Sequence, residues 1–66
     1  MTVTINGQQR RLERPLSLLD LLGQLELDPQ AVVVEHNRQI VRRAELSGRT
    51  VTDGDRIELV HFVGGG

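Results

Sequence analysis

The sequence predicts a small α+β domain in which a mixed sheet of four to five strands packs on one helix. Three observations favour this class. An alternating polar and apolar stretch opens the chain and runs into Asn6-Gly7, one leucine-rich segment has helical spacing, and apolar, β-branched runs follow it. The 66 residues suit one domain, and a domain of this size buries only about 60% of its unfolded surface.

The first predicted element is a β-hairpin. Residues 2–6 alternate in polarity, as expected for a strand with one buried face. Asn6-Gly7 favours a two-residue hairpin turn because both turn positions need a positive φ. A second strand is expected from about residue 8 to residue 13. It should end before Pro15, which lacks the N–H group that a strand ladder uses.

The spacing of apolar residues then changes from strand-like to helical. Ser17 and Asp20 fit a capping box, in which each side chain bonds to the backbone of the other residue. Leu16 and Leu21 stand at the positions of a hydrophobic staple. The stripe expected to face the sheet consists of Leu18, Leu21, Leu22 and Leu25.

The rest of the chain predicts further strands. Residues 31–35 form a β-branched run, residues 39–41 a brief strand, and residues 56–63 the last strand. Between them lies a polar stretch in which Leu46 should reach the core. Residues 52–55 should form a tight turn. Asp53 and Asp55 resemble part of a calcium loop, but one turn supplies fewer oxygens than the 6–8 that calcium takes.

The predicted order is hairpin, helix and then two or three strands. A single amphipathic helix can cover only one face of one sheet. The first hairpin is antiparallel, and a strand after the helix can return parallel to the first strand by a right-handed crossover. This mixed sheet around a single helix is the ubiquitin-like β-grasp arrangement, and we assign it to residues 1–63.

Residues 64–66 are all glycine and are predicted to form a flexible tail with a carboxylate at its tip. Gly64, Gly65 and Gly66 have no side chains to pack. Fully extended, they reach roughly 10 Å beyond the folded domain. Such a tail suits a narrow tunnel in which a partner enzyme acts on the Gly66 carboxylate. A frayed end is the alternative interpretation.

Composition limits the other functions. The chain has no cysteine, and all eight basic residues are arginine. A formal charge of −1 gives no overall attraction to nucleic acid. His36 and His61 are too few for a metal cluster, and no apolar run approaches the roughly 20 residues of a membrane span. We therefore expect a cytoplasmic protein that binds no metal or cofactor of its own.

Residues near the tail are candidates for partner binding. If the alternate residues of the last strand face the helix, Val60 and Phe62 face away from it and form an apolar surface beside the tail. Burial of Phe62 by a neighbouring loop is the alternative. Arg42 and Arg43 are candidates for the rim of this surface, or for a solvated loop. His61 is expected to be a partly exposed strand residue with no catalytic role.

Three features together resemble one known family. They are the segment from Glu35 to Arg43 with its Asn-x-x-x-Val hairpin, the segment from Thr52 to Leu59 with its Asp-Gly-Asp turn, and the terminal Gly65-Gly66. Their order and spacing are similar to those of the bacterial ThiS sulfur carriers of thiamine biosynthesis. This chain departs from many members by having Arg42 in place of proline and Gly64 in place of alanine. Neither change alters the terminal pair of glycines.

The resemblance implies a protein cosubstrate rather than an enzyme. A partner adenylating enzyme of the ubiquitin-activating type would join the Gly66 carboxylate to AMP, using ATP and magnesium. A persulfide donor would then replace AMP and leave a thiocarboxylate on Gly66. Thiazole synthase would use that sulfur to build the thiazole ring of thiamine.

Two other functional classes remain open. A molybdopterin-type sulfur carrier or a ubiquitin-like modifier would share the fold and the diglycine end, although molybdopterin carriers tend to be longer. Neighbouring biosynthetic genes would distinguish these cases. A β-grasp regulatory or RNA-binding module should instead show a basic or aromatic binding face, and this chain has a single aromatic residue.

Overall fold

The computed structural model of the protein describes residues 1–61. The main sheet has five strands, in the spatial order β2-β1-β7-β4-β5. Its strands are β1 (Thr2–Ile5), β2 (Gln8–Arg11), β4 (Val32–His36), β5 (Gln39–Val41) and β7 (Arg56–His61). The other elements are the helix α1 (Leu18–Gln24), the 3-10 helices η1 (Pro29–Ala31) and η2 (Arg43–Gly48), and the short strands β3 (Leu16–Ser17) and β6 (Thr50–Val51).

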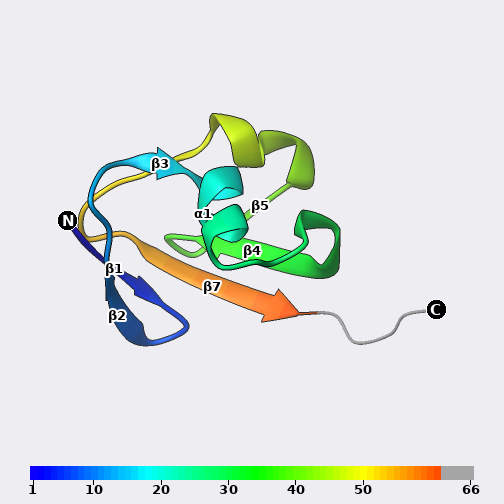
Figure 1. Ribbon diagram of the computed structural model, residues 1–66. Coiled ribbons are helices and arrows are strands. Elements are labelled where there is room, and N and C mark those ends of the chain that lie inside the picture. Colours follow the sequence, from blue (N-terminus) through cyan, green and yellow to red (C-terminus); the bar gives the residue numbers. More distant parts are fainter. Residues whose placement is uncertain (62–66) are drawn as a thin grey trace.

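The sheet is mixed, as the sequence predicts. The hairpins β1–β2 and β4–β5 are both antiparallel. The last strand, β7, lies between them and pairs parallel with β1 and antiparallel with β4. The helix α1 lies over one face of this sheet (Figure 1). The predicted ubiquitin-like β-grasp arrangement is therefore confirmed, and it is β7 that returns parallel to the first strand.

Both hairpins of the main sheet have turns with positive φ. Asn6 and Gly7 have φ values of 49° and 79°, which confirms the turn predicted from this pair. Asn37 and Arg38 have φ values of 50° and 70°. An arginine in this region is uncommon, because the Cβ atom crowds the backbone there.

The turn asparagines also hold β7 in place. The Asn6 side chain accepts a hydrogen bond from the Leu59 N–H at 2.7 Å and donates one to the Leu59 carbonyl at 3.2 Å. Asn37 accepts from the Arg56 N–H through its side chain at 2.9 Å, and its own N–H donates to the Arg56 carbonyl at 2.8 Å. One asparagine from each hairpin therefore fixes the position of the last strand.

The core forms between α1 and the sheet. The Ser17 hydroxyl accepts from the Asp20 N–H at 3.0 Å, as expected for a residue that caps a helix. Leu18, Leu21 and Leu22 are each no more than 1% exposed, in agreement with the predicted stripe. They pack in one cluster with the inward residues of the sheet, including Val3, Ile5, Val34 and Ile57.

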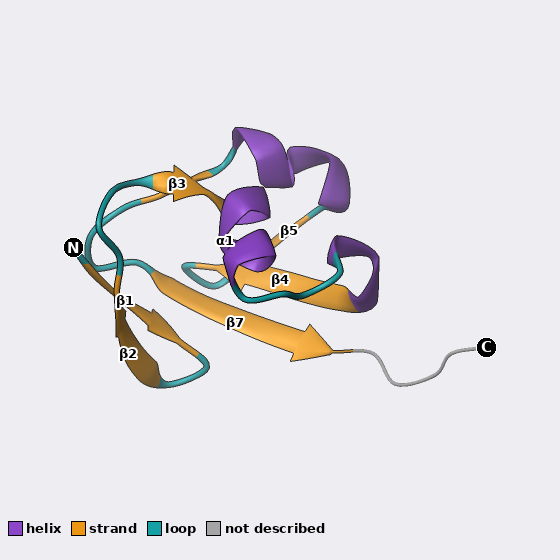
Figure 2. Cartoon of the chain, in the orientation of Figure 1, coloured by secondary structure: helices purple, strands orange, loops and turns teal. Residues whose placement is uncertain are grey.

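Some boundaries and one small sheet differ from the sequence prediction. Strand β2 ends at Arg11 rather than at residue 13, although Leu12 is still buried. The strands β3 and β6 form a separate two-stranded sheet that the sequence did not predict (Figure 2). The polar stretch after β5 forms η2, which packs against α1 and buries Leu46 as predicted.

The helices of the described part are short. The longest, α1, has seven residues, and among residues 1–61 no helix is long and apolar enough to cross a membrane.

Candidate functional site

Strand β7 is the last described element before the predicted tail. It is a central strand, with β1 on one side and β4 on the other. Five residues of β7 are in register with β4, from Ile57 opposite His36 to His61 opposite Val32. The root of the tail therefore starts from a well-anchored strand. The glycines 64–66 and Phe62 lie outside the described residues, so their predicted roles stay predictions.

Side chains alternate along β7 as the sequence predicts. Ile57 is fully buried and Leu59 is half-buried against the core under α1. Val60 lies on the outer face of the sheet and is 60% exposed. The expectation that Val60 faces away from the helix is confirmed, whereas its role in binding stays a prediction. His61 is exposed at the end of the strand, as expected.

A second apolar residue is exposed on the same outer face. Ile40 of β5 is 71% exposed, and its register partner is Glu35 on β4. Val33 lies on β4 two residues before Glu35, on the same face, and stands opposite Val60 of β7. Val60, Val33 and Ile40 thus lie across three adjacent strands on the face away from α1, and we call this the outer surface. Sequence analysis missed Ile40, although its alternation with buried Val41 indicates an outward side chain.

Charged side chains surround these apolar residues. Glu35 and Glu58 stand directly opposite each other on β4 and β7. The Arg56 guanidinium lies 3.5 Å from the Glu58 carboxylate, and these three residues line a shallow hollow of about 250 Å³ together with Arg38. Like charges directly opposite each other destabilise a strand pair, so the arginines partly compensate for the two glutamates.

The two arginines proposed for the rim occupy different places. Arg42 is exposed, directly follows β5, and has an extended backbone with φ −69° and ψ 150°. Continuing the β4–β5 register by one residue places it opposite Val33. Arg43 is also exposed but begins η2, which turns toward α1. The structure thus places Arg42 beside the outer surface and directs the chain away from it at Arg43.

A buried polar cluster near the start of β7 was not predicted. His36 is 7% exposed, and its Nε2 lies 2.7 Å from an oxygen of Asp55. Its Nδ1 accepts a hydrogen bond from Arg49 Nε at 3.4 Å, so the proton shared with Asp55 is carried by Nε2. Asp55 also accepts from the Thr52 N–H at 2.8 Å and from the Asn37 amide at 3.1 Å.

These contacts change the acidity of Asp55. Partial burial opposes ionisation, but the bonds from Thr52, His36 and Asn37 outweigh it and hold the pKa of the carboxyl below its ordinary value. The cluster joins the β4–β5 turn, the end of η2 and the turn before β7. Because each of its groups has a partner within the fold, we assign it a structural role.

Comparison with known proteins identifies the family. The model of the ThiS family matches residues 3–66, which is almost the whole chain and includes all three final glycines. The chain belongs to the ThiS family. This finding confirms the resemblance seen in the sequence and favours it over a molybdopterin-type carrier or an RNA-binding module.

Individual relatives agree with the family match. The chain is 35% identical over 63 residues to the sulfur carrier protein ThiS of Bacillus subtilis, covering 94% of this chain and 96% of that protein. A crystal structure of the thiamine biosynthesis protein ThiS from Geobacter metallireducens matches with a TM-score of 0.87 and 33% identity, over the full length of both chains.

Longer relatives also contain a region similar to this chain. It is 39% identical over 66 residues to a thiazole synthase of Paramagnetospirillum magneticum and 36% identical to one of Magnetococcus marinus. The chain spans 20% of the length of each of these relatives. A ThiS-like region can therefore be part of a longer polypeptide.

Proposed function

We propose that this chain is a sulfur carrier of thiamine biosynthesis and that sulfur is carried on the C-terminal carboxyl of Gly66. The observation that carries the proposal is the ThiS family match over residues 3–66, which includes Gly64, Gly65 and Gly66. A Bacillus subtilis relative of nearly the same length is itself named as a sulfur carrier. The central position of β7 supports the proposal, because it gives the tail a fixed starting point.

The carboxylate must be activated before sulfur can be attached. It is ionised at pH 7, since the pKa of a terminal carboxyl is about 3.5, and the anion is a poor electrophile. In the proposed first step, a partner adenylating enzyme of the ubiquitin-activating type binds ATP and magnesium together with the tail. A Gly66 oxygen attacks the α-phosphorus, pyrophosphate leaves, and an acyl adenylate forms.

Sulfur then replaces AMP. A persulfide on a donor protein attacks the Gly66 carbonyl through its terminal sulfur, and AMP leaves. The product is an acyl disulfide that joins Gly66 to the donor protein. A second thiol then attacks the cysteine sulfur of the donor, a new disulfide forms between these two sulfurs, and the thiocarboxylate is released on Gly66. Every thiol in this sequence belongs to a partner, because the carrier has no cysteine. In these steps the carrier is a cosubstrate on which the partner enzymes act.

The thiocarboxylate is then consumed by a thiazole-forming enzyme. The similarity of this chain to regions of two thiazole synthases supports that enzyme as the second partner. A thiocarboxylate sulfur is a good nucleophile at neutral pH, so it can attack an electrophilic carbon of the ring precursor. An oxygen nucleophile, from water or from the precursor, then takes the Gly66 acyl group; the bond between that acyl carbon and sulfur breaks, sulfur stays on the ring precursor, and hydrolysis returns Gly66 as a carboxylate. Thiazole synthase is therefore the proposed sulfur acceptor.

Recognition by the activating enzyme needs more than the tail. Three glycines offer little area and lose conformational freedom when they are ordered in a tunnel. The outer surface beside the tail root offers Val60 and Ile40 as exposed anchors. We include Phe62 in this docking region on the strength of the sequence pattern, and Arg42 because it follows β5 beside the outer surface. Arg43 is left out, because the chain turns toward α1 there. Such anchors typically lose about 1–3 kcal/mol of binding free energy when truncated.

The test uses ATP–pyrophosphate exchange catalysed by the activating enzyme of the same organism. Deleting Gly65 and Gly66, or adding one residue after Gly66, should abolish exchange without changing the circular dichroism spectrum. Val60→Ala should raise the carrier concentration needed for half-maximal exchange, while Thr4→Ala on the same outer face near the other end of the sheet serves as a control. Unchanged exchange with the deleted or extended tail would refute the proposed role of Gly66.

A further inference from the structure

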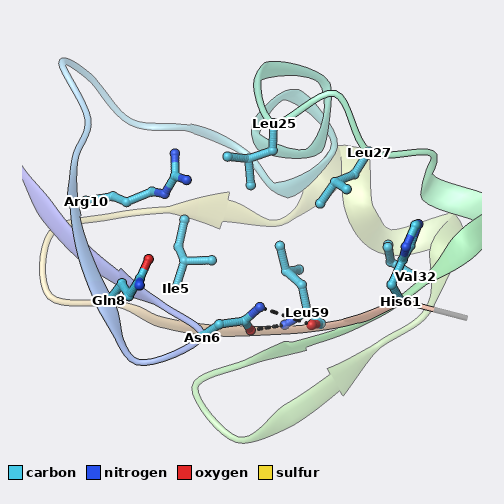
Figure 3. A pocket seen from close by; sticks show the side chains of 9 residues that line it. All are labelled: Ile5, Asn6, Gln8, Arg10, Leu25, Leu27, Val32, Leu59 and His61. Atoms are coloured by element: carbon cyan, nitrogen blue, oxygen red, sulfur yellow. Dashed lines mark hydrogen bonds between the residues drawn. The ribbon is translucent and has the colours of Figure 1, made fainter.

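A groove lies on the face of the sheet opposite the outer surface. It opens between the β1–β2 hairpin and the chain that follows α1, and its volume is about 300 Å³ (Figure 3). Its apolar walls include Ile5, Leu25, Leu27 and Leu59. This volume is at the lower end of the range for small-molecule sites, so it suits one or two side chains of a partner better than a large cofactor.

The groove also has a cationic group. Arg10 and His61 lie at its opposite ends in Figure 3, with the apolar side chains between them. Arg10 is exposed, and within residues 1–61 it forms no ion pair with a carboxylate. Asn6 also lines the groove, but its amide is already bonded to the Leu59 backbone. The Arg10 guanidinium is therefore the group best placed to bind an incoming anion.

This combination defines the chemistry of an occupant. An arginine can bind a carboxylate through two parallel N–H···O bonds, and the leucine-lined walls favour a bulky apolar side chain. A protein segment with a carboxylate next to such a side chain satisfies both requirements. An occupant of this kind would lie beside the root of the tail, because His61 is the last described residue of β7.

Strand alternation separates this groove from the outer surface. Val60 points to one face of the sheet and His61 to the other, so the tail root is flanked by two surfaces that can be altered independently. A carrier that serves two enzymes in turn must leave the first before the second can take its tail. Two separate surfaces allow the two affinities to be set independently.

We propose that the groove docks an acidic, apolar segment of thiazole synthase, while the activating enzyme uses the outer surface. This inference rests on the proposed sulfur-carrier function. It adds a binding site on the helix side of the sheet and assigns Arg10 as the residue that recognises the carboxylate.

The test compares two adjacent arginines of β2. Arg10 is in register with Val3 on the helix side, whereas Arg11 is in register with Thr2 on the outer face. Both are exposed, so Arg10→Glu and Arg11→Glu change the net charge equally. Affinity for purified thiazole synthase of the same organism is measured by calorimetry. Because charge reversal places like charges together, Arg10→Glu should weaken binding by about tenfold or more, and Arg11→Glu by less than about twofold.

Two further measurements separate the possible results. Melting curves should show that both variants fold, and ATP–pyrophosphate exchange with the activating enzyme should be the same for both. Equal affinities of the two variants for thiazole synthase, or no binding by the wild-type chain, would overturn the groove proposal. A selective loss of exchange in Arg10→Glu would also overturn it, since the activating enzyme would then be the occupant. The calorimetric titration with thiazole synthase does not need the Gly66 adenylate. A failure of Gly66 activation would therefore appear only in the exchange assay and would not be confused with a failure of groove binding.

Discussion

Replacing Asp55 should destabilise the fold far more than replacing its neighbour Asp53. Both aspartates lie in the turn before β7, and both accept hydrogen bonds. The Asp55–His36 contact is short at 2.7 Å, and the two side chains are only 13% and 9% exposed. Asp53 instead accepts from the exposed Thr2 N–H at 2.7 Å. The two substitutions to alanine therefore compare a shielded bond with an exposed one.

The expected size follows from these contacts. A bond to a charged group contributes about 1.5–3 kcal/mol, and a buried donor left without a partner costs about 1–3 kcal/mol. The Thr52 N–H and the Asn37 amide are exposed and can bond to water after the substitution, so they add little. Asp55→Ala should lower the free energy of unfolding by about 2–4 kcal/mol, and Asp53→Ala by about 0.5–1 kcal/mol.

The assay is urea unfolding at pH 7, followed by circular dichroism, with thermal melting as a second measurement. For a domain of this size each kcal/mol shifts the melting temperature by about 4–8 °C, so Asp55→Ala should melt about 10–30 °C lower than the wild type. A loss no larger than that of Asp53→Ala would refute the structural role of the His36–Asp55 contact.

Three further predictions concern acidity, the helix cap and the sheet faces. Because the folded pKa of Asp55 lies below its unfolded value, its contribution is complete above about pH 4 and is lost as pH falls through the folded pKa; the stability gap between wild type and Asp55→Asn should therefore shrink from pH 6 to pH 3. Ser17→Ala should cost about 1 kcal/mol in urea unfolding, and the exposed Ser47→Ala less than about 0.5 kcal/mol, and equal losses would contradict the cap. Ile40→Ala should change the free energy of unfolding by less than about 0.5 kcal/mol. The Val41 side chain is only 5% exposed, so Val41→Ala should lower the free energy of unfolding by about 1–3 kcal/mol. A larger loss for Ile40→Ala than for Val41→Ala would show that the faces of β5 are assigned wrongly.

Features governed by local chemistry were predictable from the sequence. The Asn6-Gly7 turn needs two positive φ angles, and the structure has both. Ser17 caps α1 because its hydroxyl is one turn from an unpaired N–H group. The outward position of Val60 follows from period-two alternation in a strand that is long enough to show it.

Features that depend on distant pairing were not predictable in this way. The strands β3 and β6 are each two residues long, which is too short to show an alternation of polar and apolar residues. Leu16 pairs with Val51, which lies far from it in the sequence. Likewise, no local pattern links His36 to Asp55, which meet only after β4 and the turn before β7 are aligned. Arg10 looked like an ordinary residue of an edge strand, and the groove exists only because the chain after α1 folds over it.

The central claim is that sulfur is carried on Gly66, and the absence of cysteine makes it directly measurable. The carrier is incubated with its activating enzyme, ATP, magnesium and a persulfide donor, treated with a thiol-selective alkylating reagent, and weighed intact by mass spectrometry. Because the sequence contains no thiol, any label must be on newly attached sulfur. The account predicts one oxygen-to-sulfur exchange and one label per chain, located at Gly66 by fragmentation and missing when Gly65 and Gly66 are deleted. An unlabelled chain of unchanged mass, or a label that persists in the deletion variant, would contradict it.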